Sequence, residues 1–277
     1  MKSIIIICVS LFTLCVQATD IVIGSLAQNP TWVSGGGNNL IARCTSVIPG
    51  NDSYTKLLLH CDGANGGTNF PDSSASANNV TTVGTAQNTT AVKKFGTAAL
   101  LLDGDSDYLT IPASTNFNFG YGAFTYDFWV NLHNVAANAE LISSREGGVR
   151  AFGMTYVQSI ASIQINHITV WPTSSLMMRI PFSPATNVWY HIAFVRIDNA
   201  DAATSWRGFI NGTNQTLTLV SGAWSNACPI VGNYIAIGRN GDDPSGYADG
   251  QIDEVRISKG IARWTNNFTP PTQSYGE

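Results

Sequence analysis

Asp253 is the residue whose surroundings most clearly require a chemical partner. It lies in residues 250–264, GQIDEVRISKGIARW, where apolar and polar residues otherwise alternate as in a closing β-strand. In a regular strand Asp253 shares one side with Val255 and Ile257. A buried carboxylate is costly unless a cation or several donors meet it, so we expect Ca²⁺, an arginine or backbone N–H groups beside it. The alternative is a β-bulge that turns Asp253 to solvent, because Ile252 has the wrong parity for a regular strand.

The other acidic residues do not form a catalytic pattern. Glycoside hydrolases need two carboxylates about 5 to 9.5 Å apart across a sugar cleft. Glu140, Glu146 and Glu254 are isolated from one another in the sequence, and Glu254 follows Asp253 directly, so that the two side chains point apart in a strand. The chain also lacks a GxSxG motif and a phosphate-binding loop. We therefore predict no catalytic residues, and a glycoside hydrolase is the less favoured alternative.

A first set of candidate ligand-binding residues lies in the strand predicted at 124–132, FTYDFWVNL. One face of this strand is wholly apolar, and the other combines Asp127, Trp129 and Asn131. An aromatic ring can stack on a sugar while neighbouring polar groups bond its hydroxyls. We therefore include Asp127 and Trp129 among the candidate ligand-binding residues.

A second set lies in loops, which carry function on rigid β-sandwiches. Arg239, Asp242, Asp243 and Tyr247 occur just before the final strand, and Trp171 ends a strand directly before a proline. All five are candidate ligand-binding residues. The alternative is that Asp-Asp-Pro and Asn-Gly here are ordinary turn sequences.

Short apolar stretches separated by Gly, Asn, Asp and Pro must position these residues, and none has a convincing helical stripe. About a dozen such strands predict an all-β fold, a two-sheet antiparallel β-sandwich or jelly roll. The predicted strands are 57–60, 98–102, 108–111, 124–132, 141–143, 151–157, 162–170, 176–180, 189–197, 206–210, 234–237 and 251–257.

The amino terminus has the pattern of a secretory signal peptide. A lysine at position 2 precedes an apolar run at 4–16 and a Val-Gln-Ala sequence suited to cleavage before Thr19. The run is too short for a comfortable membrane span of about 20 residues. We expect a signal peptide at 1–18, an arm or linker at 19–54 and a domain at 55–277, with secretion and no stable membrane span after cleavage. A retained hydrophobic arm is the alternative.

The charge content of the chain argues against one class of binding partner, nucleic acid. Charged residues make up 12% of the chain, about half of the usual 25%. The net charge of −4 and the absence of Lys/Arg runs argue against nucleic acid. Cleavage of the signal would leave Cys44, Cys61 and Cys228, an odd number, so one disulfide or three buried thiols both remain open.

Five motifs in order resemble the laminin-G-like, concanavalin A-like jelly-roll domains. They are FGTAALLLDGDSDYLTIP at 95–112, AFTYDFWVN at 123–131, WYHIAFVR at 189–196, FING at 209–212 and GQIDEVRI at 250–257. The sequences LLLHCDG at 57–63 and IARWTNNFTPP at 261–271 look most like versions in bacteriophage and environmental viral structural proteins.

The resemblance implies two antiparallel sheets, often a structural Ca²⁺, and binding of glycans or other proteins without catalysis. It places Asp253 of the IDEV motif and Asp62 of the HCDG motif as calcium ligands, so that one ion ties the two ends of the domain together. The expected partner is a glycan or a surface protein, in a secreted or extracellular protein. The alternative is a structural or interaction protein of a virion, fibre or cell surface, for which a homo-oligomer is expected.

Overall fold

The computed structural model describes residues 50–276, apart from 147–148, 171–173, 226–227, 229–233 and 240–245, together with four short strands before residue 50. The chain divides into two units, Met1–Val47 and Ile48–Glu277. In the first unit, β1 (Ser3–Ile4) pairs in parallel with β2 (Asp20–Ile21), and β3 (Thr31–Gly35) forms a hairpin with β4 (Asn39–Arg43).

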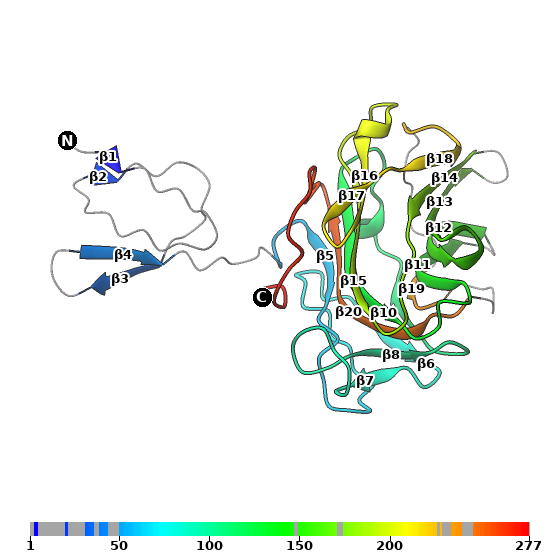
Figure 1. Ribbon diagram of the computed structural model, residues 1–277, viewed down its shortest axis with the longest axis horizontal. Coiled ribbons are helices and arrows are strands. Elements are labelled where there is room, and N and C mark those ends of the chain that lie inside the picture. Colours follow the sequence, from blue (N-terminus) through cyan, green and yellow to red (C-terminus); the bar gives the residue numbers. More distant parts are fainter. Residues whose placement is uncertain are drawn as a thin grey trace. The chain divides into compact units, whose positions relative to one another are not determined.

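The second unit is a β-sandwich (Figure 1). One layer, which we name the β10 sheet, has the strand order β17-β16-β15-β10-β20-β8-β7, with β5 also paired to β20. Its strands are β5 (Thr55–Leu59), β7 (Gln87–Thr89), β8 (Ala99–Asp103), β10 (Phe124–Leu132), β15 (Trp189–Arg196), β16 (Trp206–Ile210), β17 (Thr213–Gln215) and β20 (Asp249–Lys259).

The other layer, the β12 sheet, has the order β18-β14-β13-β12-β11-β19-β9-β6. Its strands are β6 (Thr81–Val83), β9 (Tyr108–Pro112), β11 (Ala139–Glu146), β12 (Val149–Val157), β13 (Ser162–Val170), β14 (Ser174–Pro181), β18 (Thr218–Ser221) and β19 (Tyr234–Ile237). Three 3-10 turns, η1 (Thr115–Phe117), η2 (Gln158–Ile160) and η3 (Ala203–Ser205), are the helical elements of the described chain.

The predicted all-β sandwich is confirmed, and every strand pair within the two sheets is antiparallel. The predicted bounds of β10, β13, β16 and β19 agree with the structure. Four strands were not predicted from the sequence, because they have three or four residues each and too little apolar alternation: β6, β7, β17 and β18.

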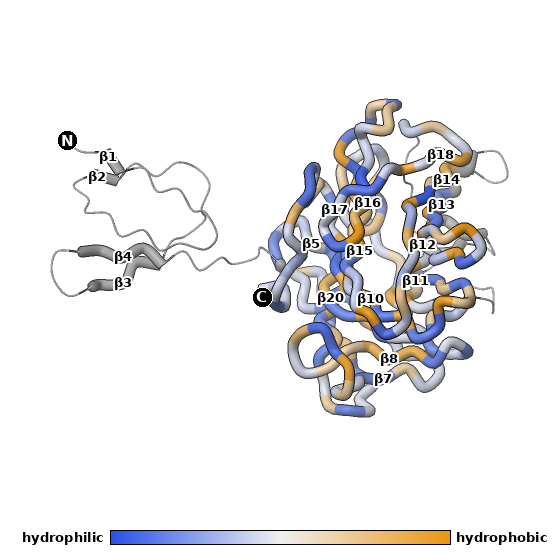
Figure 2. The backbone as a smooth tube through the Cα atoms, viewed as in Figure 1, coloured by the Kyte–Doolittle hydropathy of each residue, from blue (hydrophilic) through white to orange (hydrophobic). Residues whose placement is uncertain are grey.

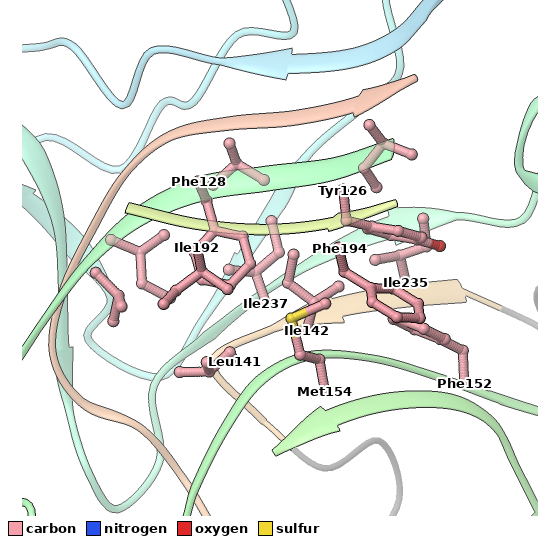
Figure 3. Close-up of a cluster of buried hydrophobic side chains, with 14 of the residues drawn as sticks. Tyr126, Phe128, Leu141, Ile142, Phe152, Met154, Ile192, Phe194, Ile235 and Ile237 are labelled. Atoms are coloured by element: carbon pink, nitrogen blue, oxygen red, sulfur yellow. The ribbon is translucent and has the colours of Figure 1, made fainter. Parts of the chain in front are cut away.

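The core lies between the two sheets. Figure 3 shows Tyr126 and Phe128 of β10 with Ile192 and Phe194 of β15, all buried, among side chains of the β12 sheet. Their partners there include Leu141, Ile142, Phe152, Met154, Ile235 and Ile237. The tube in Figure 2 changes between hydrophobic and hydrophilic colours along the strands, as expected for strands with one face on a core.

A second covering layer lies on the outer face of the β10 sheet, the face turned away from the β12 sheet. Ala193, Val195 and Phe209 form a small buried cluster there, packed against Trp264 and Phe268 of the carboxyl-terminal segment. The Trp264 and Phe268 rings stack with centroids 4.1 Å apart. Figure 1 shows this segment beside the β10 sheet. The outer face of the β10 sheet is therefore covered.

Among the residues that the structure describes, no helix has the length and apolar character needed to cross a membrane.

Candidate functional site

A β-bulge in β20 decides where Asp253 points. Asp127 of β10 pairs with Arg256 and Trp129 pairs with Asp253, so two residues of β20 stand opposite one of β10. Glu254 lies in this bulge and has a positive φ of 51°. The bulge that we considered is present, but Asp253 is fully buried and not turned to solvent.

The bulge also changes the parity of the strand. Ile252, Val255 and Ile257 all belong to the inter-sheet core, which a regular strand would not allow. Asp253 therefore does not share a face with Val255 and Ile257, and that prediction is wrong. Its carboxyl group lies on the outer face of the β10 sheet.

Backbone N–H groups surround the Asp253 carboxyl group. Oδ2 accepts hydrogen bonds from the N–H of Lys94 at 2.8 Å and of Phe95 at 3.1 Å, and Oδ1 accepts one from Glu254 at 2.9 Å. Burial raises the pKa of Asp253 to about 8, although these three donors oppose the rise.

Asp62, the other predicted calcium ligand, lies in the loop after β5. Its Oδ1 accepts hydrogen bonds from the N–H groups of Thr97 and Ala98 and from the Thr97 hydroxyl. Gly96 has a φ of +55° and packs so closely that a Cβ there would collide with both Asp62 oxygens. Backbone N–H groups were among the partners that the sequence predicted for Asp253.

The donor set does not fit a calcium ion. Ca²⁺ requires six to eight oxygen ligands, whereas five N–H groups and a hydroxyl donate to the two carboxyl groups. Within the described ranges, no three His, Cys, Asp or Glu side chains gather closely enough to hold a metal. These contacts give Asp62 and Asp253 hydrogen-bonding roles that need no metal.

Asp127 is buried in an ion pair and does not reach solvent. Its Oδ1 and Oδ2 accept hydrogen bonds from Nε and Nη2 of Arg256, each at 3.1 Å, and Oδ2 also accepts one from the Tyr275 hydroxyl. Burial opposes ionisation, but Arg256 and His191 outweigh it and lower the pKa of Asp127 to about 2. The prediction that Asp127 contacts a ligand is therefore wrong.

Trp129 is 5% exposed and is surrounded by other side chains. Its ring meets Phe95 and His191 edge to face, with centroids 5.8 and 5.2 Å away, and Lys94 Nζ lies 3.9 Å from the ring centroid. No face of the indole is open for a sugar, so this second prediction is also wrong. The alternation of β10 is as predicted, but loops cover its polar face.

The structure brings together two other predicted residues, Arg239 and Tyr247, and adds Tyr108 to them. The Arg239 guanidinium lies 4.7 Å from the Tyr108 ring centroid and 5.5 Å from that of Tyr247, and Nη1 donates to the Tyr108 hydroxyl at 2.7 Å. All three side chains are partly buried. We name them the tyrosine–arginine cluster. Trp171, Asp242 and Asp243 lie outside the described residues.

Arg239 has unused binding capacity. In the described part of the chain it has no ion pair, and its Nε is buried without a hydrogen-bond partner. A buried donor without an acceptor destabilises the protein by about 1–3 kcal/mol. The cluster therefore places a cation that has no ion pair in the described chain beside two aromatic rings.

A row of polar residues continues from this cluster across the outer face of the β12 sheet. The Glu140 N–H donates to the carbonyl of Gly246, next to Tyr247. Glu140 is opposite Thr155, which is opposite Gln164, which is opposite Arg179. We name these four residues the polar row.

The polar row is held by its own hydrogen bonds. The Thr155 hydroxyl donates to Glu140 Oε2 at 2.7 Å, and Arg179 Nε donates to Gln164 Oε1 at 3.4 Å. Gln164 and Arg179 are partly exposed. The sequence patterns did not single out these residues or Tyr108, although Ser162, Gln164 and Asn166 alternate with isoleucines and indicate an outer face.

The fold is shared with solved toxin domains. The binding domain of Paraclostridial Mosquitocidal Protein 1 is 12% identical, with a TM-score of 0.57 over 76% of this chain and 50% of that chain. The binding domain of botulinum neurotoxin DC, solved with rat synaptotagmin II, is 13% identical, with a TM-score of 0.55 over 75% and 49%.

A third similar structure is described by the words "Cell entry of botulinum neurotoxin type C is dependent upon interaction with two ganglioside molecules". It is 12% identical, with a TM-score of 0.54 over 75% of this chain and 48% of that chain. The protein thus spans about half the length of these solved chains. At such identities the likeness shows the fold alone.

The comparison with curated proteins found no match. A family model described as the concanavalin A-like lectin/glucanases superfamily matches residues 103–263. This range includes β9 to β20 and leaves out β5, β6, β7 and all but the last residue of β8. This match spans more than half of the chain, in agreement with the predicted resemblance. The protein belongs to the concanavalin A-like lectin/glucanases superfamily.

Proposed function

We propose that this protein is a non-catalytic glycan-binding module that works outside the cell. Its binding site is the tyrosine–arginine cluster of Tyr108, Arg239 and Tyr247, extended by the polar row. The observation that carries this proposal is the Arg239 guanidinium beside two partly buried tyrosine rings whose centroids lie 6.4 Å apart, with no ion pair to Arg239 in the described chain.

The chemistry of the cluster suits a sugar. A tyrosine ring offers an apolar surface for the C–H face of a pyranose, and its hydroxyl and the guanidinium bond the sugar hydroxyls. Binding sites combine such apolar surfaces with a few well-placed polar groups. The polar row lies in register across four strands, and its partly exposed members, Gln164 and Arg179, offer amide and guanidinium groups along the same face, whereas Glu140 and Thr155 are buried.

Two further observations support the proposal. Two of the toxin structures that share the fold are described as binding domains. For the third, cell entry of the neurotoxin is described as dependent on interaction with two ganglioside molecules, which are lipids with a glycan headgroup. The amino-terminal sequence with its apolar run at 4–16 suits export to the compartment where such glycans occur.

A glycan array probed with the full chain tests the proposal, followed by titration calorimetry on each glycan bound. We expect Tyr247→Ala and Arg239→Lys to weaken binding about tenfold, the equivalent of one lost contact of about 1.4 kcal/mol. Tyr121→Ala is the matched control, because Tyr121 is 61% exposed and lies before β10, away from the cluster.

Three results would overturn the proposal. Unchanged affinity in both cluster variants would place the site elsewhere on the domain. Binding to no glycan, together with a stable closed oligomer on size-exclusion chromatography, would favour the structural role. Release of reducing sugar from a bound glycan would show that the protein is catalytic.

A further inference from the structure

The backbone of residues 94–98 donates hydrogen bonds to two carboxyl groups, those of Asp253 and Asp62. The N–H groups of Lys94 and Phe95 donate to Asp253, and those of Thr97 and Ala98 donate to Asp62. Four of the five consecutive N–H groups are used in this way. The fifth residue, Gly96, lies between the two pairs.

The two carboxyl groups come from opposite ends of the domain sequence. Asp62 follows β5, and β5 pairs with β20, where Leu59 is opposite Val255. Asp253 lies in β20 itself, two residues from Val255. The segment 94–98 thus bridges the loop after the first strand of the sandwich and its last strand.

The conformation of Gly96 allows the N–H groups on its two sides to donate to two different carboxyl groups. Its φ of +55° is a left-handed conformation, which reverses the chain between the two pairs of donors. A side chain here would collide with the Asp62 carboxyl group. Successive N–H groups around a left-handed residue form a concave nest that binds oxygen anions.

No side-chain cation takes over this role. The only lysine of the segment, Lys94, directs its Nζ over the Trp129 ring, 3.9 Å from the centroid. Within the described chain, neither Asp62 nor Asp253 has an ion pair with a basic side chain. The hydrogen bonds of the backbone therefore hold both carboxyl groups.

We propose that the backbone nest at residues 94–98 does here what a structural calcium ion would do, tying the first strand region to the last strand, so that the domain is stable without calcium. The resemblance to laminin-G-like domains implied that one ion joins Asp62 to Asp253. In this chain a glycine-centred loop joins them instead.

Amide hydrogen exchange on the full chain tests the proposal directly. We expect the amides of residues 94, 95, 97 and 98 to be protected equally in calcium chloride and in chelator. Asp62→Ala should lose protection at 97 and 98, and Asp253→Ala should lose it at 94 and 95, because alanine has no side-chain oxygen to accept these hydrogen bonds. Protection of the wild type that requires calcium would overturn the proposal, whether or not the variants fold.

Thermal melting gives a second test with a matched pair of glycines. Gly120 has nearly the same φ as Gly96, +53°, but a Cβ there would meet nothing within 4 Å. Both alanine variants suffer the left-handed strain, and only Gly96→Ala also displaces Asp62. We expect Gly96→Ala to melt at least about 4 °C lower than Gly120→Ala. Equal melting of the two variants, or a wild-type melting temperature that rises with calcium and not in Asp253→Asn, would contradict the proposal.

Discussion

Asp127 and Arg256 form a two-point ion pair on adjacent strands, with both hydrogen bonds at 3.1 Å and both side chains shielded from solvent. The Arg256 guanidinium carbon also lies 3.7 Å from the Tyr275 ring centroid. The pair therefore joins β10, β20 and the carboxyl-terminal segment on the outer face of the β10 sheet.

Removing one partner of this pair leaves the other charge buried. We expect Asp127→Asn to lower the free energy of unfolding by about 3–5 kcal/mol, because the Arg256 charge loses its counter-charge. Arg256→Met should have a similar effect. In the double variant the losses should not add, and a coupling energy of at least about 1 kcal/mol should appear in urea denaturation.

The pair of Asp52 and Arg263 is the control, because the Asp52 side chain is 32% exposed and the coupling energy of this pair should be smaller. Strictly additive losses at 127 and 256 would contradict this prediction.

The Tyr275 hydroxyl should contribute measurably to stability. It donates to Asp127, while the Tyr275 N–H donates to Glu254 Oε2 at 3.0 Å. Tyr275→Phe keeps the ring on Arg256 and removes only the hydroxyl. We expect a loss of about 1–2 kcal/mol in urea denaturation, since the buried carboxylate loses a donor. Tyr121→Phe should lose nothing, because Tyr121 is 61% exposed. An equal change in the two variants would argue against a specific role for Tyr275.

Acid should destabilise the domain in part through His167. Burial, with the nearby charge of Arg196, lowers the pKa of His167 from 6.5 to about 3. Above pH 6.5 the histidine is neutral in the folded and unfolded chains alike. Between 6.5 and 3 the unfolded chain binds a proton that the folded chain does not, so stability falls by up to about 1.4 kcal/mol for each pH unit.

Urea denaturation from pH 7 to 4 measures this slope. His167→Gln should flatten it, because glutamine does not titrate. The remaining slope should combine His191, whose pKa burial also lowers, with Asp253, whose pKa of about 8 makes its contribution to stability rise as the pH falls. A wild-type slope that is unchanged in His167→Gln would show that His167 does not titrate as described.

Two cysteines should be inert in the folded protein. Cys61 and Cys228 are free buried thiols, so no disulfide joins them, whereas Cys44 lies outside the described residues. Burial raises the pKa of Cys228 to about 12 despite the opposing effect of Arg196, and burial also raises that of Cys61. Alkylation mapped by mass spectrometry should modify both only after unfolding. Rapid modification of either in the native protein would contradict their burial.

Some features that were predicted from the sequence remain predictions. The signal peptide at 1–18, secretion, the likeness to viral structural proteins and the boundary at residue 55 all rest on sequence patterns. Within the segment 19–54, predicted as an arm or linker, β3 and β4 pair in antiparallel fashion, and no strands were predicted there.

The sequence by itself determined the two-sheet sandwich and the bounds of strands such as β10, because alternation with period two is a local property of the chain. It also identified Arg239 and Tyr247 as neighbours in one loop region. It did not indicate Tyr108, which is far away in the sequence and joins them only because β9 pairs with β19.

Only the tertiary structure decided what each polar face contacts. Alternation placed Asp127 and Trp129 on one side of β10, but whether that side meets water or other residues depends on segments far away in the sequence. In the same way, the bulge at Glu254 shifts Asp253 onto the outer face, where the N–H groups of residues 94 and 95 meet it. A buried carboxyl group must find partners, and the sequence showed that need for Asp253. Long-range packing determined that the partners are backbone N–H groups, because only the folded chain brings that loop to β20.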